Sequence, residues 1–137
     1  MALFEQNAGN GLPLLVDMAI DLQTGLPLEK NGKPVLLTGL QALRQWVHFA
    51  LAPESRRFAY AAHTADYGNE FESLAGKPAV EAESRLPEMI RQALEVNPYI
   101  TAVTGLTVAQ REDGFAAHFT LVTVYGEMEY EGEAIDA

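Results

Sequence analysis

Two segments with helical periodicity lie between segments that have the pattern of β-strands, and this order constrains the fold more than any other feature of the chain. Apolar residues recur at helical spacing within 40–50 and again within 86–94. Strand-like segments, which alternate or are rich in Thr and Val, lie at 14–22, 99–108 and 115–125. Strands that flank two helices predict an α+β fold: a single small domain in which an antiparallel or mixed sheet is packed by two main helices.

The N-terminal part is expected to form a half-buried strand and a hairpin. Residues 14–22 alternate, and the apolar positions on one face are Val16, Met18, Ile20 and Leu22. Segments 26–29 and 34–37 flank Asn31-Gly32, a dipeptide that favours a type I′ turn because both residues tolerate positive φ. The sequence therefore predicts a short hairpin here.

The first helix is expected to begin after Thr38, whose side chain can accept a hydrogen bond from a backbone N–H of the first turn, and to end before Pro53. A short helix is expected over 70–74, stopped by Gly76. The buried face of the first helix would carry Leu40, Leu43, Trp46, Val47 and Ala50. Its outer face would carry Gln41, Arg44, Gln45 and His48.

The second main helix is expected within 80–96. Ser84 before Pro87 predicts its start, and Asn97-Pro98 predicts its end. The apolar positions that form its buried stripe are Leu86, Met89, Ile90, Ala93 and Leu94. A strand is expected to follow directly.

Alternating patterns in the C-terminal part, within 115–125 and 127–131, predict two further strands. In the first, Phe115, Phe119 and Leu121 share one face. After Gly126, the acidic residues Glu127, Glu129 and Glu131 alternate with Met128 and Tyr130. Charges along a strand commonly block edge-to-edge aggregation. The same edge could instead accept a strand from a neighbouring protein, and both interpretations remain open.

Charge and composition exclude several classes of function. The 137 residues include 9 basic and 19 acidic ones, and a net charge of −10 would repel bare nucleic acid or an anionic membrane. The absence of cysteine excludes disulfides and thiol nucleophiles. No targeting segment and no membrane-length apolar stretch is visible, so we expect a soluble protein that is made in the cytoplasm and does not insert into a membrane. No Lys or Arg follows Arg111, which predicts either a solvated acidic tail or an acidic edge that meets a basic partner.

The chain is expected to hold one domain. Residues 1–12 are rich in Gly and Asn and have no periodicity, which predicts a flexible N-terminal arm. No internal repeat, low-complexity tract or long linker divides the rest, so residues 13–137 are expected to form a single domain.

The residues that could support catalysis or metal binding lack the spacing that such sites need. His48, His63 and His118 show no metal-ligand spacing. Asp17 and Asp21 lie about 13 Å apart along a strand, wider than the roughly 5–9.5 Å of a glycosidase pair. Four further acidic residues cluster in the sequence: Glu54, Asp66, Glu70 and Glu72. Folding could bring two of them together, or they could be solvated charges at a helix end. We therefore expect no catalytic residue, no metal ion and no cofactor.

Arg56 and Arg57 stand beside aromatic residues in an otherwise acidic protein. They are either surface charge offset by neighbouring glutamates or a bidentate anchor for a carboxylate of a partner subunit, and both interpretations remain open. The candidate partner-binding residues are Arg56, Arg57, Tyr67, Glu127, Glu129 and Tyr130.

Several short motifs occur in a characteristic order. They are a Gly-x-x-Ala-Leu-x-Gln-Trp helix at 39–46, an Arg followed by aromatics at 57–60, Asp-Tyr-Gly-x-Glu at 66–70 and a Leu-x-Gly stop at 74–76. Related pieces follow at 93–100 and 124–127. In this order the motifs resemble the XkdS-like family of baseplate proteins from contractile phage tails and prophage particles. That family belongs with the wider wedge group that includes phage protein W and the T-even sheath initiator. The resemblance covers about residues 16–130.

The resemblance implies a structural component of a contractile tail baseplate and not an enzyme. Such proteins sit around the central hub, typically as six copies, link wedge proteins to the inner tube region and template the first ring of tail sheath. The implied partners are the tail sheath protein, baseplate wedge proteins and hub or tube proteins, and the implied location is the virion. Sheath subunits exchange strands, so the terminal strands here could supply a matching edge.

Two other functions stay open on the sequence alone. The first is a cell-wall glycosidase of the baseplate, which would need two carboxylates at working distance in a cleft. The second is a regulatory protein-binding module, because a stress-response anti-adaptor family has a similar fold and fold alone does not determine function.

Overall fold

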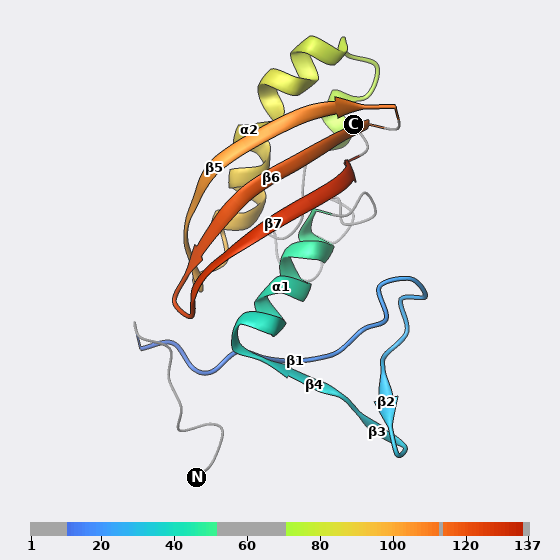
Figure 1. Ribbon diagram of the computed structural model, residues 1–137, viewed down its shortest axis with the longest axis vertical. Coiled ribbons are helices and arrows are strands. Elements are labelled where there is room, and N and C mark those ends of the chain that lie inside the picture. Colours follow the sequence, from blue (N-terminus) through green and yellow to red (C-terminus); the bar gives the residue numbers. More distant parts are fainter. Residues whose placement is uncertain (1–10, 52–70, 113, 136–137) are drawn as a thin grey trace.

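The computed structural model describes residues 11–51, 71–112 and 114–135, and the structural statements below concern these residues. Helices and antiparallel sheets in the expected order confirm the predicted α+β fold (Figure 1). Along the chain the elements are β1 (Val16–Met18), β2 (Glu29–Lys30), β3 (Lys33–Pro34), β4 (Leu36–Thr38), α1 (Gly39–Ala50), the 3₁₀ helix η2 (Phe71–Leu74), α2 (Ala79–Glu95), β5 (Ile100–Arg111), β6 (Gly114–Thr123) and β7 (Gly126–Ile135).

Strands β5, β6 and β7 form an antiparallel sheet in that order, and α2 lies against one of its faces (Figure 1). Strand β6 alternates as predicted, and its buried positions are Phe115, Ala117, Phe119, Leu121 and Thr123. This face packs with the apolar stripes of α1 and α2 in one core, whose fully buried residues include Leu43, Val47, Leu86, Ile90 and Leu94. Burial of these stripes is what holds the helices on the sheet.

Residues 16–38 form a narrow extension beside α1, here called the N-terminal ribbon (Figure 1). Within it, β1 pairs antiparallel with β4 and β2 pairs antiparallel with β3. The turn between β2 and β3 has a φ of 55° at Asn31 and 76° at Gly32. The predicted hairpin is therefore confirmed, with positive φ at both central residues.

The predicted half-buried strand at 14–22 is wrong in both length and burial. Strand β1 has only three residues, and all of them are exposed. Asp21 ends the extended segment because its Oδ1 accepts hydrogen bonds from the backbone N–H groups of Gln23 and Thr24. Alternation cannot distinguish a strand that packs on the core from one in a two-stranded ribbon, where solvent reaches both faces.

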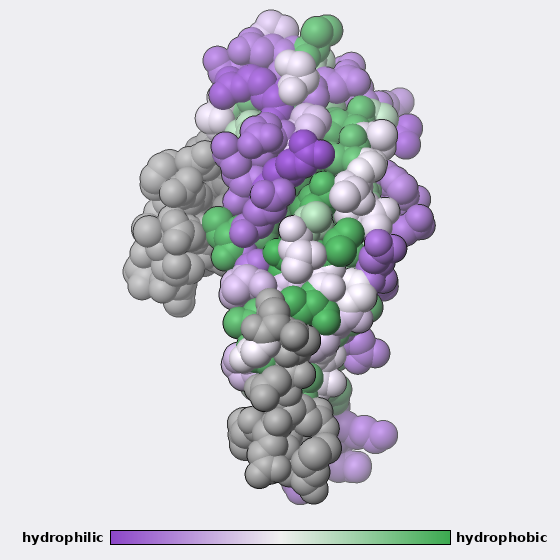
Figure 2. Space-filling model, turned by 90° about the vertical axis from the view of Figure 1, so that its left-hand side faces the viewer, coloured by the Kyte–Doolittle hydropathy of each residue, from purple (hydrophilic) through white to green (hydrophobic). Residues whose placement is uncertain are grey.

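Exposed apolar surface is concentrated in the N-terminal ribbon. Among the described residues, the exposed large hydrophobic side chains of the ribbon are Val16, Met18, Leu22, Leu26, Leu28 and Leu36. Val80 and Val96 are the others. Hydrophobic patches between hydrophilic ones also reach the surface on the left-hand side of Figure 1, away from the β2–β3 hairpin (Figure 2). The ribbon thus presents aliphatic groups that the core does not bury.

Helix α1 begins and ends where the sequence predicts, but two of its side chains differ from expectation. Thr38 occupies the N-cap position without making a side-chain cap hydrogen bond. Gln45, expected on the outer face, is buried with an exposed fraction of 7%. Its amide bonds to the ribbon instead of to water. A helical period alone could not indicate that a second structure covers this side of the helix.

Gly39 starts α1 with a φ of +58°, a left-handed conformation that most side chains disfavour. We predict that Gly39→Ala lowers the free energy of unfolding by about 1 kcal/mol, measured by urea denaturation. An added Cβ would lie 3.7 Å from the Tyr125 ring, an ordinary contact, so the loss would come from backbone strain. Gly39→Asn is the control and should retain more stability, because Asn tolerates this conformation. Equal losses in the two variants would contradict this explanation.

Helix α2 begins at Ala79, so the predicted start at Ser84 before Pro87 is wrong. Ser84 donates its hydroxyl to the Glu81 carbonyl one turn earlier, at 2.9 Å, and does not cap a helix. Pro87 lies inside α2, where it removes one intrahelical hydrogen bond. Burial of the helix's apolar stripe outweighs that loss.

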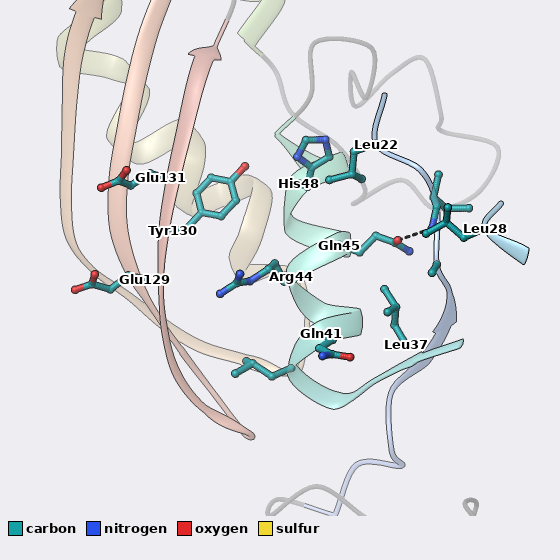
Figure 3. A pocket seen from close by; sticks show the side chains of 13 residues that line it. Leu22, Leu28, Leu37, Gln41, Arg44, Gln45, His48, Glu129, Tyr130 and Glu131 are labelled. Carbon is teal, nitrogen blue, oxygen red and sulfur yellow. Dashed lines mark hydrogen bonds between the residues drawn. The ribbon is translucent and has the colours of Figure 1, made fainter. Parts of the chain in front are cut away.

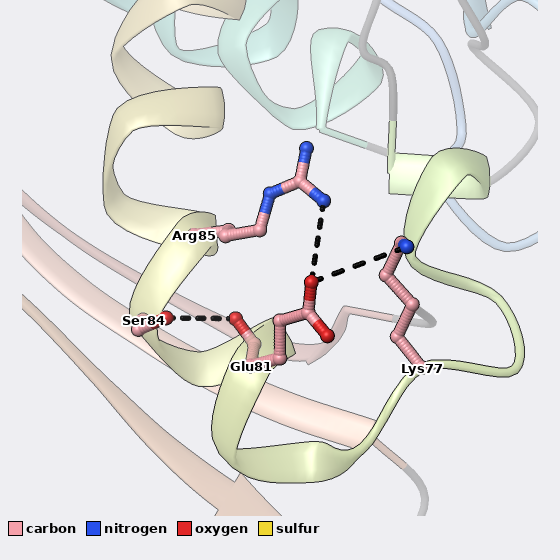
Figure 4. A network of polar contacts seen from close by, with 4 residues as sticks. All are labelled: Lys77, Glu81, Ser84 and Arg85. Atoms are coloured by element: carbon pink, nitrogen blue, oxygen red, sulfur yellow. Dashed lines mark hydrogen bonds and ion pairs between the residues drawn. The ribbon is translucent and has the colours of Figure 1, made fainter.

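The first turn of α2 carries an ion-pair cluster (Figure 4). The Glu81 carboxylate lies 4.0 Å from Lys77 Nζ and 3.8 Å from an Arg85 guanidinium nitrogen. These side chains are 39–46% exposed, so each pair stabilises the helix only slightly. The acidic side chain also complements the helix dipole at its N-terminus, which favours a start at Ala79.

Most of the remaining boundaries lie close to the predicted ones, although β5 continues to Arg111, beyond the predicted end at 108. The short helix appears as η2, followed by Gly76 with a φ of +80°. Helix α2 ends at Glu95, before Asn97-Pro98, and β5 follows at Ile100. The division into an arm at 1–12 and a domain at 13–137 stays a prediction, because most of the arm lies outside the described residues.

Candidate protein-interaction site

Strand β7 lies at one edge of the three-stranded sheet. It pairs with β6, and within the described part of the chain no strand pairs with its other edge. Alternate residues of such a strand point their backbone N–H and C=O groups away from the sheet. Another strand could form hydrogen bonds with these groups.

The outer face of β7 carries an acidic row, defined as Glu127, Glu129 and Glu131. All three are exposed. In the register with β6 they lie opposite Val122, Thr120 and His118. His118 Nε2 lies 3.9 Å from the Glu131 carboxylate, which is 79% exposed, so this contact neutralises little of the charge. The acidic row therefore leaves three carboxylates in solvent on one face of the strand.

The inner face of β7 is held by the core. Met128 is buried, and the Tyr130 ring stacks on Phe119 with 5.0 Å between ring centroids. Burial raises the pKa of the Tyr130 hydroxyl, so the side chain stays uncharged well above neutral pH. The core thus holds β7 firmly on one face and leaves its acidic face in solvent.

A groove of about 760 Å³, here called the edge groove, lies between β7, α1 and the N-terminal ribbon. Figure 3 shows Tyr130 pointing from β7 towards α1, while Glu129 and Glu131 point towards the other face of the sheet. Arg44 extends from α1 towards β7. The groove is lined by Ala19, Ile20, Leu22, Leu28, Leu37, Leu40, Gln41, Arg44, Gln45, His48, Glu129, Tyr130 and Glu131.

Gln45 attaches one wall of this groove, the ribbon, to α1. Its Nε2 donates to the Met18 carbonyl at 2.8 Å and to the Asp17 carboxylate at 3.3 Å. Its Oε1 accepts from the Ile20 N–H at 2.8 Å. One buried amide therefore bonds to three nearby residues of the ribbon and holds it at a defined distance from α1.

Two tyrosines hold the segment that leads into the ribbon. The Tyr125 hydroxyl accepts a hydrogen bond from the Leu15 N–H at 2.8 Å, and the Tyr99 hydroxyl donates to the Pro13 carbonyl. Their rings stack with 5.9 Å between centroids. Partial burial, and then the neighbouring Tyr125, raise the pKa of Tyr99. The ribbon is thus attached at its base as well as along α1.

The structure brings together only some of the residues predicted from the sequence. Glu127, Glu129 and Tyr130 lie on β7, and the last two line the edge groove. The other candidates, Arg56, Arg57 and Tyr67, lie outside the described residues. Sequence reasoning missed Gln45 and Arg44 as parts of a site. The motif at 39–46 includes Gln45, but a helical pattern could not indicate its contacts with the ribbon.

No catalytic or metal-binding arrangement appears in the described part of the chain. There, no group of three or more His, Asp or Glu could hold a metal ion. Asp17 bonds to Gln45, and Asp21 stabilises a turn. The carboxylates Glu54, Asp66 and Glu70, and the side chain of Glu72, lie outside the described structure, so the glycosidase alternative gains no support. None of the described helices has the length and apolar character needed to cross a membrane.

Comparison with known proteins identifies the family of this chain. The model of the contractile injection system sheath initiator family matches residues 16–126. The chain is also 34% identical, over 99 residues, to the phage-like element PBSX protein XkdS of Bacillus subtilis (strain 168), covering 70% of this chain and 69% of that protein. The family match runs from β1 to the first residue of β7 and confirms the resemblance drawn from the motifs, with a structural role in a contractile tail. This chain therefore belongs to the family of contractile injection system sheath initiators.

Proposed function

We propose that this protein starts sheath assembly by offering the open edge of β7 to a strand of the first ring of sheath subunits. The observation that carries the proposal is the unpaired edge of β7 within the described residues, with the acidic row on one face and the edge groove beside it. The family supports sheath initiation as the role. Support for β7 as the contact is geometric, because the family match ends where β7 begins.

Strand pairing at this edge would lower the cost of forming the first sheath ring. An incoming strand loses conformational freedom when it binds, and a preformed edge means that only one partner becomes ordered. Six copies around the tail axis would add avidity, because the binding of one subunit raises the effective concentration of the next. Templating by a rigid edge therefore needs no catalysis, and we expect no muramidase activity.

The remaining surfaces would connect the protein to the baseplate. We assign Arg56, Arg57 and Tyr67 to the wedge side, since a guanidinium fork suits a carboxylate of a partner subunit. Wedge proteins and hub or tube proteins are the expected partners there, in the baseplate of a virion assembled in the host cytoplasm. The net charge of −10 supports protein partners over nucleic acid or membrane.

Reversal of the acidic row tests the proposal. The triple variant Glu127→Lys, Glu129→Lys, Glu131→Lys should reduce the number of sheathed tails at least about tenfold, counted by electron microscopy of tail preparations. Its three side chains are exposed, so circular dichroism should show an unchanged fold.

The matched control places the same charge change on α2, as Glu83→Lys, Glu88→Lys, Glu95→Lys. These residues are also exposed but lie far along the sequence from β7. The control should assemble sheaths normally. If the β7 variant assembled normal sheaths, the proposed function would be overturned.

A further inference from the structure

The edge groove limits which strands the open edge of β7 can accept. We propose that the groove selects a partner strand in which aliphatic side chains alternate with basic ones, and that it determines the register of that strand. This inference rests on the proposed function, because it specifies the chemistry of the strand that β7 would receive.

The geometry of a sheet dictates where the partner's side chains go. A strand added to β7 would lie about 4.8 Å from it, and its side chains would alternate between the two faces of the sheet. Those on the Tyr130 side would enter the groove, and those on the Glu129 side would lie beside the acidic row (Figure 3).

The groove side favours aliphatic groups. Leu22 and Leu28 line it from the ribbon with exposed fractions of 53% and 42%, and Leu37 and Leu40 line it as well. The described residues leave this apolar surface in contact with solvent. Aliphatic side chains of an added strand would remove it from water, which is favourable in proportion to the area covered.

Charge makes the two faces of the added strand unequal. Arg44 is exposed and extends from α1 towards β7, so it would repel a Lys or Arg that entered the groove. Glu129 and Glu131 also line the groove, but their side chains point towards the opposite face (Figure 3), where the acidic row would attract the same residues. A slip of one residue exchanges the two faces of a strand. It would place basic groups beside Arg44 and aliphatic groups beside the glutamates.

Binding of synthetic peptides to the full-length protein tests the selection. The probes are three nine-residue peptides with blocked ends and a fluorescent label: Lys and Val in alternation, Lys and Ser in alternation, and Lys and Val in blocks of two. Fluorescence anisotropy at low ionic strength should show at least tenfold tighter binding of the alternating Lys/Val peptide than of either other peptide.

Three variants separate the groove from simple charge attraction. Leu22→Ser with Leu28→Ser should remove most of the preference for Val over Ser. The control Leu26→Ser with Leu36→Ser changes exposed ribbon leucines that do not line the groove and should keep it. Arg44→Glu should reduce the preference for the alternating Lys/Val peptide over the peptide with Lys and Val in blocks of two, because the groove would then tolerate lysine side chains.

The possible outcomes are distinct for the two proposals. Equal binding of the Lys/Val and Lys/Ser peptides, or equal effects of the two double-leucine variants, would overturn selection by the groove. If the charge-reversed β7 variant still lost its sheaths, the proposed function would stand. Selective peptide binding together with normal sheaths on that variant would overturn the proposed function and leave the groove as a strand-binding site.

Discussion

Phe119→Ala is expected to lower the free energy of unfolding by about 3–5 kcal/mol, because it removes a large aromatic side chain from the core. Phe119 lies in the middle of β6, is fully buried and belongs to the core between the sheet and the helices. Its loss leaves a cavity and also removes the ring that stacks on Tyr130 at 5.0 Å. Because small domains are stable by only about 5–15 kcal/mol, the variant should be close to unfolding.

Urea denaturation followed by circular dichroism measures this loss. Phe119→Leu should cost less, because the leucine side chain fills much of the space. Thr120→Ala, on the outer face of the same strand, should change stability by less than about 0.5 kcal/mol. A loss below about 1 kcal/mol for Phe119→Ala would contradict the assignment of β6 as the centre of the core.

Gln45→Leu is expected to release the N-terminal ribbon from α1, at a cost of about 2–3 kcal/mol. The leucine cannot accept from the Ile20 N–H or donate to the Met18 carbonyl, and both groups would lose their partner. Since the sheet keeps its own contacts, the loss should be local. Hydrogen exchange should accelerate at the ribbon amides and change little in β6.

Two further variants identify the source of this effect. Gln41→Leu, on the exposed side of the same helix, should leave exchange in the ribbon unchanged. Gln45→Glu retains an acceptor for Ile20 but brings a carboxylate to Asp17 and the Met18 carbonyl, so it should also release the ribbon. Unchanged exchange at Ile20 in Gln45→Leu would show that the ribbon is held by other contacts.

Release of the ribbon also has a functional consequence. The ribbon contributes Leu22, Leu28 and Leu37 to the edge groove, and Gln45 holds these residues opposite β7. In the proposed mechanism, Gln45→Leu would therefore weaken selection of a partner strand while leaving the acidic row in place. Peptide binding by this variant should resemble that of Leu22→Ser with Leu28→Ser.

Local patterns predicted much of the fold because they depend on neighbouring residues alone. The alternation of β6, the apolar stripe of α2 and the Asn31-Gly32 turn each follow from a period or from backbone preferences. The start of α2 did not follow from them. Ser84 before Pro87 is an acceptable local start, but Ala82 is also buried, and tertiary packing favours a longer helix.

The sequence by itself determined the two helices, the acidic strand at the C-terminal side and the family, because these depend on order and residue type. Only the tertiary structure decided that Val16–Met18 form an exposed strand of the ribbon, that Gln45 is buried beneath the ribbon, and that α1 faces the open edge of β7. These features depend on which distant segments meet. A period of 2 or 3.6 residues specifies which side chains share a face, but not what that face contacts.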